Sequence, residues 1–176
     1  MPDITRRAAL RLGAGAAGAA AFGAVHRPAR AGADQVAPTM VTGSFASAAR
    51  GGAPTNWAIA RPPGQTQPLR PVIALHGKGS SAASVMAGGV EGGLAQAVQA
   101  GLPPFAVVAV DGGGSYWHRR ASGEDAGAMV LDELLPMLGE QGLDTSRVGL
   151  MGWSMGGYGA LLLGARLGPA RTAAIC

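Results

Sequence analysis

Short apolar runs recur along the chain and alternate with segments that have helical character. The runs lack the regular polar positions of a half-exposed strand, which is typical of strands buried on both faces of a parallel sheet. We expect such strands at residues 71–75, 104–110, 146–151 and 173–175. We expect helices at residues 90–100, 125–141 and 157–167. This alternation predicts an α/β fold, with a mostly parallel sheet and helices on both of its faces.

Two further strands precede this alternation. Residues 40–47 and 55–60 have strand character, and the sequence Gly51-Gly52-Ala53-Pro54 between them is typical of a turn. We therefore predict a β-hairpin at the start of the folded part. Residues 61–71 are rich in Pro and Gln and are expected to form a surface connection to the first parallel strand.

The expected helix at residues 125–141 contains a residue that disturbs a regular helix. The apolar residues of this segment fall at roughly helical spacing and would form one buried stripe. The acidic residues expected to face away from the stripe are Asp132, Glu133 and Glu140. Pro136 has no N–H for a helix hydrogen bond, and its ring clashes with the preceding turn, so it predicts a kink.

The first 33 residues have the pattern of an export signal. Arg6 and Arg7 lie in a segment that resembles the twin-arginine motif, and a Gly/Ala-rich apolar stretch follows at residues 12–25. That stretch is too short and too weakly apolar for a stable membrane anchor, which needs about 20 apolar residues. We expect residues 1–33 to be a signal peptide read by the twin-arginine export machinery. The protein would then be exported, to the periplasm or the extracellular space, with residues 34–176 as its folded domain. The alternative is an N-terminus that stays attached.

The net charge of +4 does not indicate a nucleic-acid-binding protein. The first 33 residues contain five arginines and one aspartate, so they carry the whole net charge. From Asp34 onward, nine basic residues balance nine acidic ones. The sequence of the folded part therefore has no basic stripe, and binding to a phosphate backbone is not expected.

Cysteine and histidine usage points away from disulfides and metals. Cys176 is the one cysteine of the chain, so no intrachain disulfide can form. We expect it to be a small buried residue of a strand, with a free thiol or an intermolecular bond as alternatives. No Cys/His cluster has metal-ligand spacing, and no glycine motif is placed to hold a phosphate or a dinucleotide. We therefore expect no metal and no cofactor.

The pattern G-x-S-x-G occurs at Gly152-Trp153-Ser154-Met155-Gly156, between an expected strand and an expected helix. A serine on such a sharp turn is typical of a nucleophile elbow, which exposes its Oγ. Gly152 and Gly156 would let the strand and the helix approach without Cβ clashes, and the Met155 N–H would stabilise an oxyanion. The alternative is a glycine-rich turn in which Ser154 is an ordinary N-cap.

The loop after the first parallel strand, His76-Gly77-Lys78-Gly79, is of the HG type. In hydrolases with a nucleophile elbow, such a loop supplies the second oxyanion-hole donor, which we assign to the backbone N–H of Lys78. Gly77 and His76 would support this loop. In hydrolases with a nucleophile elbow, the catalytic histidine follows the serine in the chain. His76 precedes Ser154, so we expect His76 to shape the loop.

A second glycine-rich loop, residues 111–118, follows the next strand. Tyr116 and Trp117 are candidates for the lining of an acyl or alcohol pocket. Asp111 and His118 have residue types suited to a catalytic triad. Both precede Ser154 in the chain, so we do not expect either of them to belong to a triad.

Residues 152–161 resemble the elbow of one esterase branch of the α/β-hydrolases, the branch that includes esterase D, feruloyl esterases and mycolyltransferases. Residues 75–77 and 111–117 are similar to that family as well. So are residues 132–136, a segment that in the family lies in the helix before the elbow strand. The similarity extends from about residue 39 to residue 176.

The resemblance implies the three-layer α/β-hydrolase sandwich, of which residues 34–176 would form the N-terminal two-thirds, an incomplete domain. It also implies a serine esterase that hydrolyses small-molecule or polymeric carboxylic esters through an acyl-enzyme on Ser154. In the order of the family, the triad acid and histidine would lie beyond Cys176. We therefore expect negligible esterase turnover from the 176-residue chain itself.

Two other functions stay open on the sequence. The first is a non-catalytic, hydrolase-like module that binds a ligand or a partner, which the missing triad partners would explain. The second is acyl transfer to an alcohol in the manner of the mycolyltransferases. That reaction would use the same nucleophile and the same acyl-enzyme.

Overall fold

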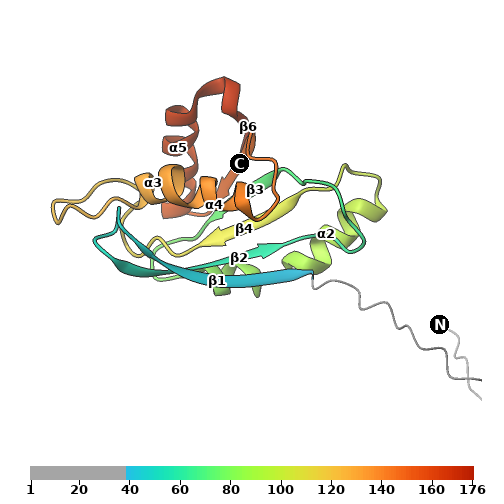
Figure 1. Cartoon of the computed structure of the whole chain (residues 1–176), viewed down its shortest axis with the longest axis horizontal. Coiled ribbons are helices and arrows are strands. Elements are labelled where there is room, and N and C mark those ends of the chain that lie inside the picture. Colours follow the sequence, from blue (N-terminus) through green and yellow to red (C-terminus); the bar gives the residue numbers. More distant parts are fainter. Residues whose placement is uncertain (1–38) are drawn as a thin grey trace, which may run out of the picture. The chain divides into compact units, whose positions relative to one another are not determined.

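The computed structural model describes residues 39–176. The expected signal peptide, residues 1–33, lies outside the described residues. Within the described part, one sheet holds six strands in the order β1-β2-β4-β3-β5-β6 (Figure 1). They are β1 (Met40–Ser47), β2 (Ala53–Ala60), β3 (Pro71–Leu75), β4 (Ala106–Val110), β5 (Val148–Gly152) and β6 (Thr172–Ile175). The hairpin β1–β2 and the pair β2–β4 are antiparallel, and the other pairs are parallel.

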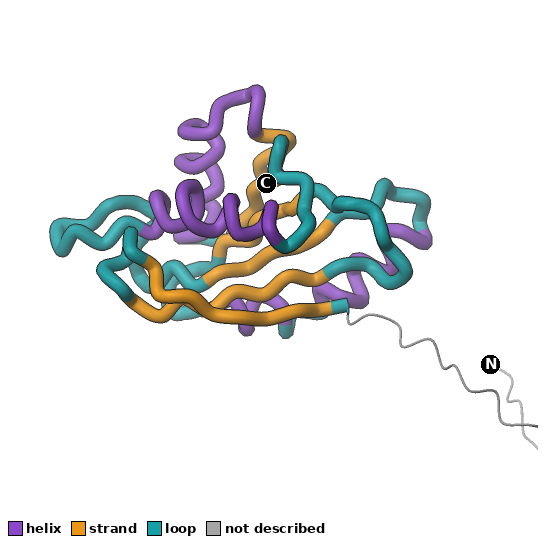
Figure 2. The backbone as a smooth tube through the Cα atoms, viewed as in Figure 1, coloured by secondary structure: helices purple, strands orange, loops and turns teal. Residues whose placement is uncertain are grey.

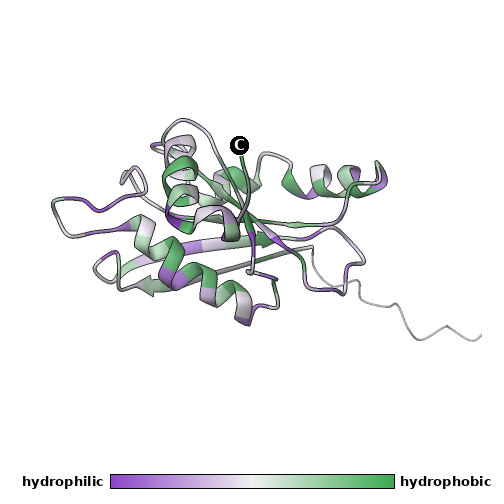
Figure 3. Cartoon of the chain, turned by 90° about the horizontal axis from the view of Figure 1, so that it is seen from above, coloured by the Kyte–Doolittle hydropathy of each residue, from purple (hydrophilic) through white to green (hydrophobic). Residues whose placement is uncertain are grey.

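Helices cover both faces of the sheet, as expected for an α/β fold (Figure 2). The helical segments are α1 (Ala82–Met86), α2 (Val90–Gln99), α3 (Ala126–Ala128), the π-helix η1 (Met129–Leu134), α4 (Leu135–Glu140) and α5 (Met155–Arg171). Helices α1 and α2 lie on one face, and the segments from α3 to α5 lie on the other (Figure 1). Both polar and apolar residues occur along the helices, in keeping with one face toward the sheet and one toward solvent (Figure 3).

The two faces of the sheet are packed with side chains of different size. Neighbouring strand residues point to opposite faces, so Ile59 and Ile73 belong to one core, while Ala58 and Ala74 belong to the other. The core under α3–α5 contains large residues, including Trp117 and the leucines of α4. The core under α1 and α2 is rich in alanine, which lets these short helices lie close to the strands.

The segment expected to be one kinked helix consists of α3, η1 and α4. Helix α4 contains Pro136 in its first turn, and the Leu135 N–H donates to the carbonyl of Val130, five residues earlier. A π-helical turn is wider than an α-helical one. The disturbance that Pro136 predicted therefore takes the form of a π-helix just before it.

Glu133, which was expected to face away from the apolar stripe, is half-buried and bonded to the hairpin. Its carboxylate accepts hydrogen bonds from the Ser47 hydroxyl (2.5 Å) and from the Ala49 N–H (2.7 Å). Glu133 thus fastens η1 to the end of β1, whereas Asp132 and Glu140 are exposed as expected.

Within residues 39–176, no helix has both the length and the apolar character needed to cross a bilayer.

Candidate active site

Ser154 stands at a sharp turn between β5 and α5. Its backbone has φ 55° and ψ −115°, a conformation that non-glycine residues rarely adopt. An ordinary N-cap is extended and accepts a hydrogen bond from the first helical turn. Ser154 precedes α5 but makes no such side-chain bond, and its side chain is exposed. This is the backbone geometry that a nucleophile elbow requires.

The elbow packs too closely for side chains at its two glycines. An ideal Cβ on Gly152 would lie 2.2 Å from the backbone carbonyl carbon of Gly156, and one on Gly156 would meet the backbone of Leu75. Because no side chain fits between these segments, the first turn of α5 rests directly on the ends of β3 and β5. This contact fixes where Ser154 stands relative to the sheet.

The two expected oxyanion donors have no acceptor among the described residues. Met155 is the first residue of α5, where an N–H has no intrahelical partner. The Lys78 N–H is likewise without an acceptor in residues 39–176. An ideal Cβ on Gly77 would lie 3.3 Å from the Trp153 carbonyl oxygen and 3.9 Å from the Ser154 Cβ, so the loop touches the elbow.

A cavity of about 520 Å³ opens beside this contact. Gly77 and Lys78 line it from one side, and Gly152 and Trp153 line it from the other. Its walls are mainly apolar, with Ala74, Val85 and Met151 among them. The volume is within the usual range of small-molecule sites, which is about 300–1,000 Å³.

His76 is buried and joins two loops. Its Nε2 accepts a hydrogen bond from the Gly112 N–H (2.9 Å), so the ring proton is assigned to Nδ1, which lies 2.7 Å from the Gly77 carbonyl oxygen. Both ring nitrogens are therefore engaged. Neither is free to take a proton from Ser154, and the arrangement is one that shapes the loop.

Trp117 does not line a surface pocket, contrary to the expectation from the sequence. Its side chain is fully buried, and its ring lies edge-on to His76 at 5.2 Å between centroids. An ideal Cβ on Gly112 or on Gly159 would come within 2.6 Å of the indole ring. The indole fills space left by these two glycines, which the sequence pattern did not reveal.

Tyr116 is part of a surface cluster of rings. Its side chain is partly exposed and lies edge-on to Tyr158, one turn after Ser154 on α5. His118 also packs edge-on against Tyr158. The His118 nitrogens contact the Arg119 carbonyl oxygen (2.8 Å) and the Arg120 guanidinium (3.2 Å). Tyr116 therefore remains a candidate for substrate contact, in a different environment from Trp117.

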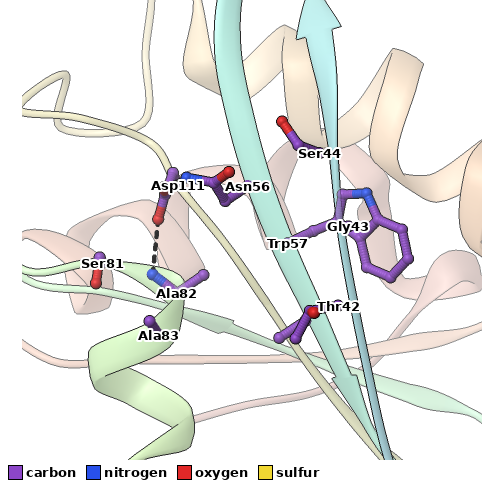
Figure 4. Close-up of a pocket in the computed structure, with 10 residues that line it drawn as sticks. Thr42, Gly43, Ser44, Asn56, Trp57, Ser81, Ala82, Ala83 and Asp111 are labelled. Atoms are coloured by element: carbon purple, nitrogen blue, oxygen red, sulfur yellow. Dashed lines mark hydrogen bonds between the residues drawn. The ribbon is translucent and has the colours of Figure 1, made fainter.

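Asp111 has a role that sequence reasoning missed. Its two carboxylate oxygens accept hydrogen bonds from the Ala82 N–H (2.7 Å) and the Asn56 side-chain amide (2.9 Å) (Figure 4). Its carbonyl oxygen accepts from Arg50, which also forms a partly buried ion pair with Glu124 at 2.9 Å. The sequence feature that could have indicated this role is the position of Asp111 directly after a fully apolar strand.

Two further observations concern possible metal ligands and the cysteine. Among residues 39–176, no group of three or more His, Cys, Asp or Glu side chains is arranged to hold a metal ion. Cys176 is exposed, not buried as expected. It continues the pairing of β6, because its N–H donates to the Leu150 carbonyl (2.9 Å), and it lies among the residues that line the cavity described above.

Comparison with protein-family models and with curated proteins gives no significant match. Solved structures do match. A ferulic acid esterase aligns at a TM-score of 0.67 and 20% identity, over 77% of this chain and 56% of that one. An S-formylglutathione hydrolase from Agrobacterium tumefaciens aligns at 0.63 and 24%, over 77% and 56%. The fluorophosphonate-binding serine hydrolase F of Staphylococcus aureus aligns at 0.65 and 20%, over 77% and 55%.

These structural neighbours are esterase-family α/β-hydrolases, and the chain has their fold. The predicted fold class is therefore confirmed. The chain spans little more than half the length of the neighbours it matches.

Proposed function

We propose that this chain carries the nucleophile and the oxyanion hole of a serine esterase, with Ser154 as the attacking group. One observation carries the proposal. An exposed serine in a left-handed conformation lies at a strand-to-helix turn, and a glycine loop touches this turn. The N–H of the following residue, Met155, and that of Lys78 in the loop have no acceptor among residues 39–176. An ordinary N-cap serine would be extended and would accept a hydrogen bond from the first helical turn, and Ser154 does neither.

In the proposed reaction, the Ser154 Oγ attacks the carbonyl carbon of a carboxylic ester, and its proton passes to a histidine base. The tetrahedral intermediate collapses, the ester C–O bond breaks, and the alcohol leaves with that proton. Water then hydrolyses the acyl-enzyme. The N–H groups of Met155 and Lys78 would stabilise the negative oxygen, each by about 3 kcal/mol.

The base and the acid of the triad would come from residues outside 39–176. Within that range, both ring nitrogens of His76 and of His118 are engaged with other groups. The neighbours are almost twice as long as the matched part of this chain, which is consistent with further catalytic residues elsewhere. A small-molecule or polymeric ester is the proposed substrate. Export by the twin-arginine route is part of the same proposal and rests on residues 1–33 alone.

The test is selective modification of Ser154 by an alkyl fluorophosphonate, followed by peptide mapping. The two N–H groups would stabilise the negative oxygen that develops as the Ser154 hydroxyl attacks the reagent. We therefore expect Ser154 to be modified in preference to Ser44 and Ser122 of the same chain, which are exposed. The Ser154→Ala variant is the control and should lose this selective modification. Equal modification of all three serines would refute the proposed function and favour a non-catalytic binding module.

A further inference from the structure

We propose that Asp111 is a positioning residue for the oxyanion loop, here residues 77–81. It holds the end of this loop in place, so that the Lys78 N–H faces the carbonyl oxygen of a bound ester. This inference rests on the proposed function. It adds a residue that does not touch the substrate and acts through the backbone.

Asp111 is bonded to three different segments. The carboxylate accepts from the Ala82 N–H, at the start of α1, and from the Asn56 amide on β2 (Figure 4). The carbonyl oxygen accepts from Arg50 at 3.0 Å. Asp111 itself follows β4 directly. The carboxylate is therefore held from behind by the hairpin and presents one oxygen to the residue that follows the oxyanion loop.

Two adjacent residues thus fasten both ends of the loop. Gly112 donates to the His76 ring, which immediately precedes the loop, and Asp111 accepts from Ala82, which immediately follows it. Within the described residues, no hydrogen bond from another segment reaches residues 78–80. A bond from Ser80 N–H to the Gly77 carbonyl (3.1 Å) closes the turn internally. The position of the Lys78 N–H is therefore set by the two fastened ends.

The hydrogen bonds of Asp111 argue against a role as the acid of a catalytic triad, which its residue type would allow. A triad acid accepts from the N–H of a catalytic histidine, but both oxygens of Asp111 are taken by Ala82 and Asn56. The nearby His76 ring bonds to the Gly112 N–H instead. A role confined to capping α1 would affect stability only. A positioning role would also affect the reaction at Ser154.

The test uses saturation kinetics of Ser154 modification by the fluorophosphonate in the full chain. These kinetics separate the apparent affinity for the reagent from the maximal rate constant. A displacement of about 1 Å can cost two orders of magnitude in rate. We expect Asp111→Ala to lower the maximal rate constant between about ten- and a hundredfold, with the apparent affinity within about twofold.

Two further variants serve as controls. Asp111→Asn should react within about threefold of the parent, because its oxygen still accepts from Ala82 and the Asn56 amide can turn to match the new NH₂ group. Asp144→Ala is the matched control, since Asp144 also accepts from a backbone N–H, that of Ser146 at 3.1 Å. It lies just before β5, at the opposite ends of the parallel strands, and should leave the rate unchanged.

Hydrogen exchange provides a readout that does not depend on catalysis. In Asp111→Ala, the two hydrogen-bonded amides of this segment, those of Ser80 and Ala82, should exchange at least about tenfold faster than in the parent, while those of β1 keep their protection. If the parent shows no selective modification of Ser154, the proposed function fails, and the exchange result alone decides whether Asp111 holds the loop. A parent-like rate or parent-like exchange in Asp111→Ala would overturn the positioning role, as would an equal loss in Asp111→Asn.

A double variant covers the case in which Asp111→Ala does not fold. Ala82→Pro removes the N–H that would lose its acceptor, at a first helical position where proline is tolerated. The preceding Ser81 is extended, with φ −150° and ψ 169°, as a residue before proline requires. The double variant should fold and still react slowly at Ser154. A parent-like rate in that variant would overturn the proposal.

Discussion

An ideal Cβ on Gly156 would lie 1.8 Å from the carbonyl oxygen of Leu75, so the first turn of α5 and the end of β3 meet backbone to backbone. No side-chain movement can relieve such an overlap, because the obstructing atom belongs to a central strand. The G-x-S-x-G pattern is thus a packing requirement as well as a feature of the turn.

The first prediction concerns this contact. Gly156→Ala should lower the free energy of unfolding by about 2–3 kcal/mol or more, because the backbone must shift to admit a methyl group. Urea denaturation would measure the loss. Gly92→Ala is the matched control, since nothing lies within 4 Å of an ideal Cβ there. Because Gly92 lies within α2, that variant should gain about 0.5–1 kcal/mol. A Gly156→Ala variant as stable as the parent would contradict the close contact.

The second prediction concerns backbone strain at Ser154. A non-glycine residue in a sparsely populated conformation costs about 1–3 kcal/mol, and glycine avoids most of that cost. Ser154→Gly should therefore be more stable than Ser154→Ala by about 1 kcal/mol, although both lack the nucleophile. Thermal unfolding of the two variants side by side measures the difference. Identical midpoints would show that the left-handed geometry carries no strain.

The third prediction concerns Trp117, whose indole Nε1 is buried without a hydrogen-bond partner. Trp117→Ala should destabilise the fold by about 3–5 kcal/mol, as expected for the loss of a large core side chain. Trp117→Phe should cost less than half as much, because it keeps most of the ring and removes an N–H that has no acceptor. Urea unfolding of both variants tests this. A negligible effect of Trp117→Ala would indicate that the side chain is at the surface after all.

The fourth prediction concerns acid stability. Hydrogen bonds from the Ser146 hydroxyl and backbone N–H, followed by the bond and charge of Arg70, lower the pKa of Asp144 below its ordinary value. A lowered folded-state pKa means that Asp144 contributes stability above its unfolded pKa, and that this contribution is lost as the pH falls through the folded pKa.

Asp144→Asn should therefore show a shallower loss of thermal stability in acid than the parent, with the two curves converging at the lowest pH. Melting curves between about pH 7 and pH 2 would measure this, because an ordinary aspartate titrates near pH 3.9. Asp132→Asn is the control, since Asp132 is exposed and accepts no side-chain hydrogen bond within the described residues. A parallel offset across the whole range would contradict the assignment to Asp144.

The central strands were predictable from the sequence, because a run of five apolar residues such as residues 106–110 has few other ways to be buried. The observed bounds differ from the expected ones by no more than two residues at any strand end. The sharp turn at Ser154 between a strand and a helix was also predictable, since its pattern depends on neighbouring residues. Helix α1 was missed because it is only five residues long, and its one signal was Ser81, whose side chain accepts from the Ser84 N–H.

The environments of Trp117 and Asp111 could not be predicted, because they depend on residues far away in the chain. Trp117 is buried in the space left by Gly159, 42 positions later, and Asp111 binds an amide 55 positions earlier. The local sequence pattern indicates periodicity and turns. It does not show which distant glycine leaves room for the indole ring of Trp117. The hydrogen-bond partners of Glu133 could not be predicted for the same reason, since they lie on the hairpin.

The burial of Trp117 against His76, Gly112 and Gly159 has a practical consequence for engineering. These residues come from the loop after β3, the loop after β4 and helix α5, yet they share a single block of packing. A designer who grafts a new loop into one of these places would disturb the other two. Libraries that aim to change the chemistry of this scaffold should therefore vary all three segments together, or leave this block intact and diversify Tyr116 and its exposed neighbours.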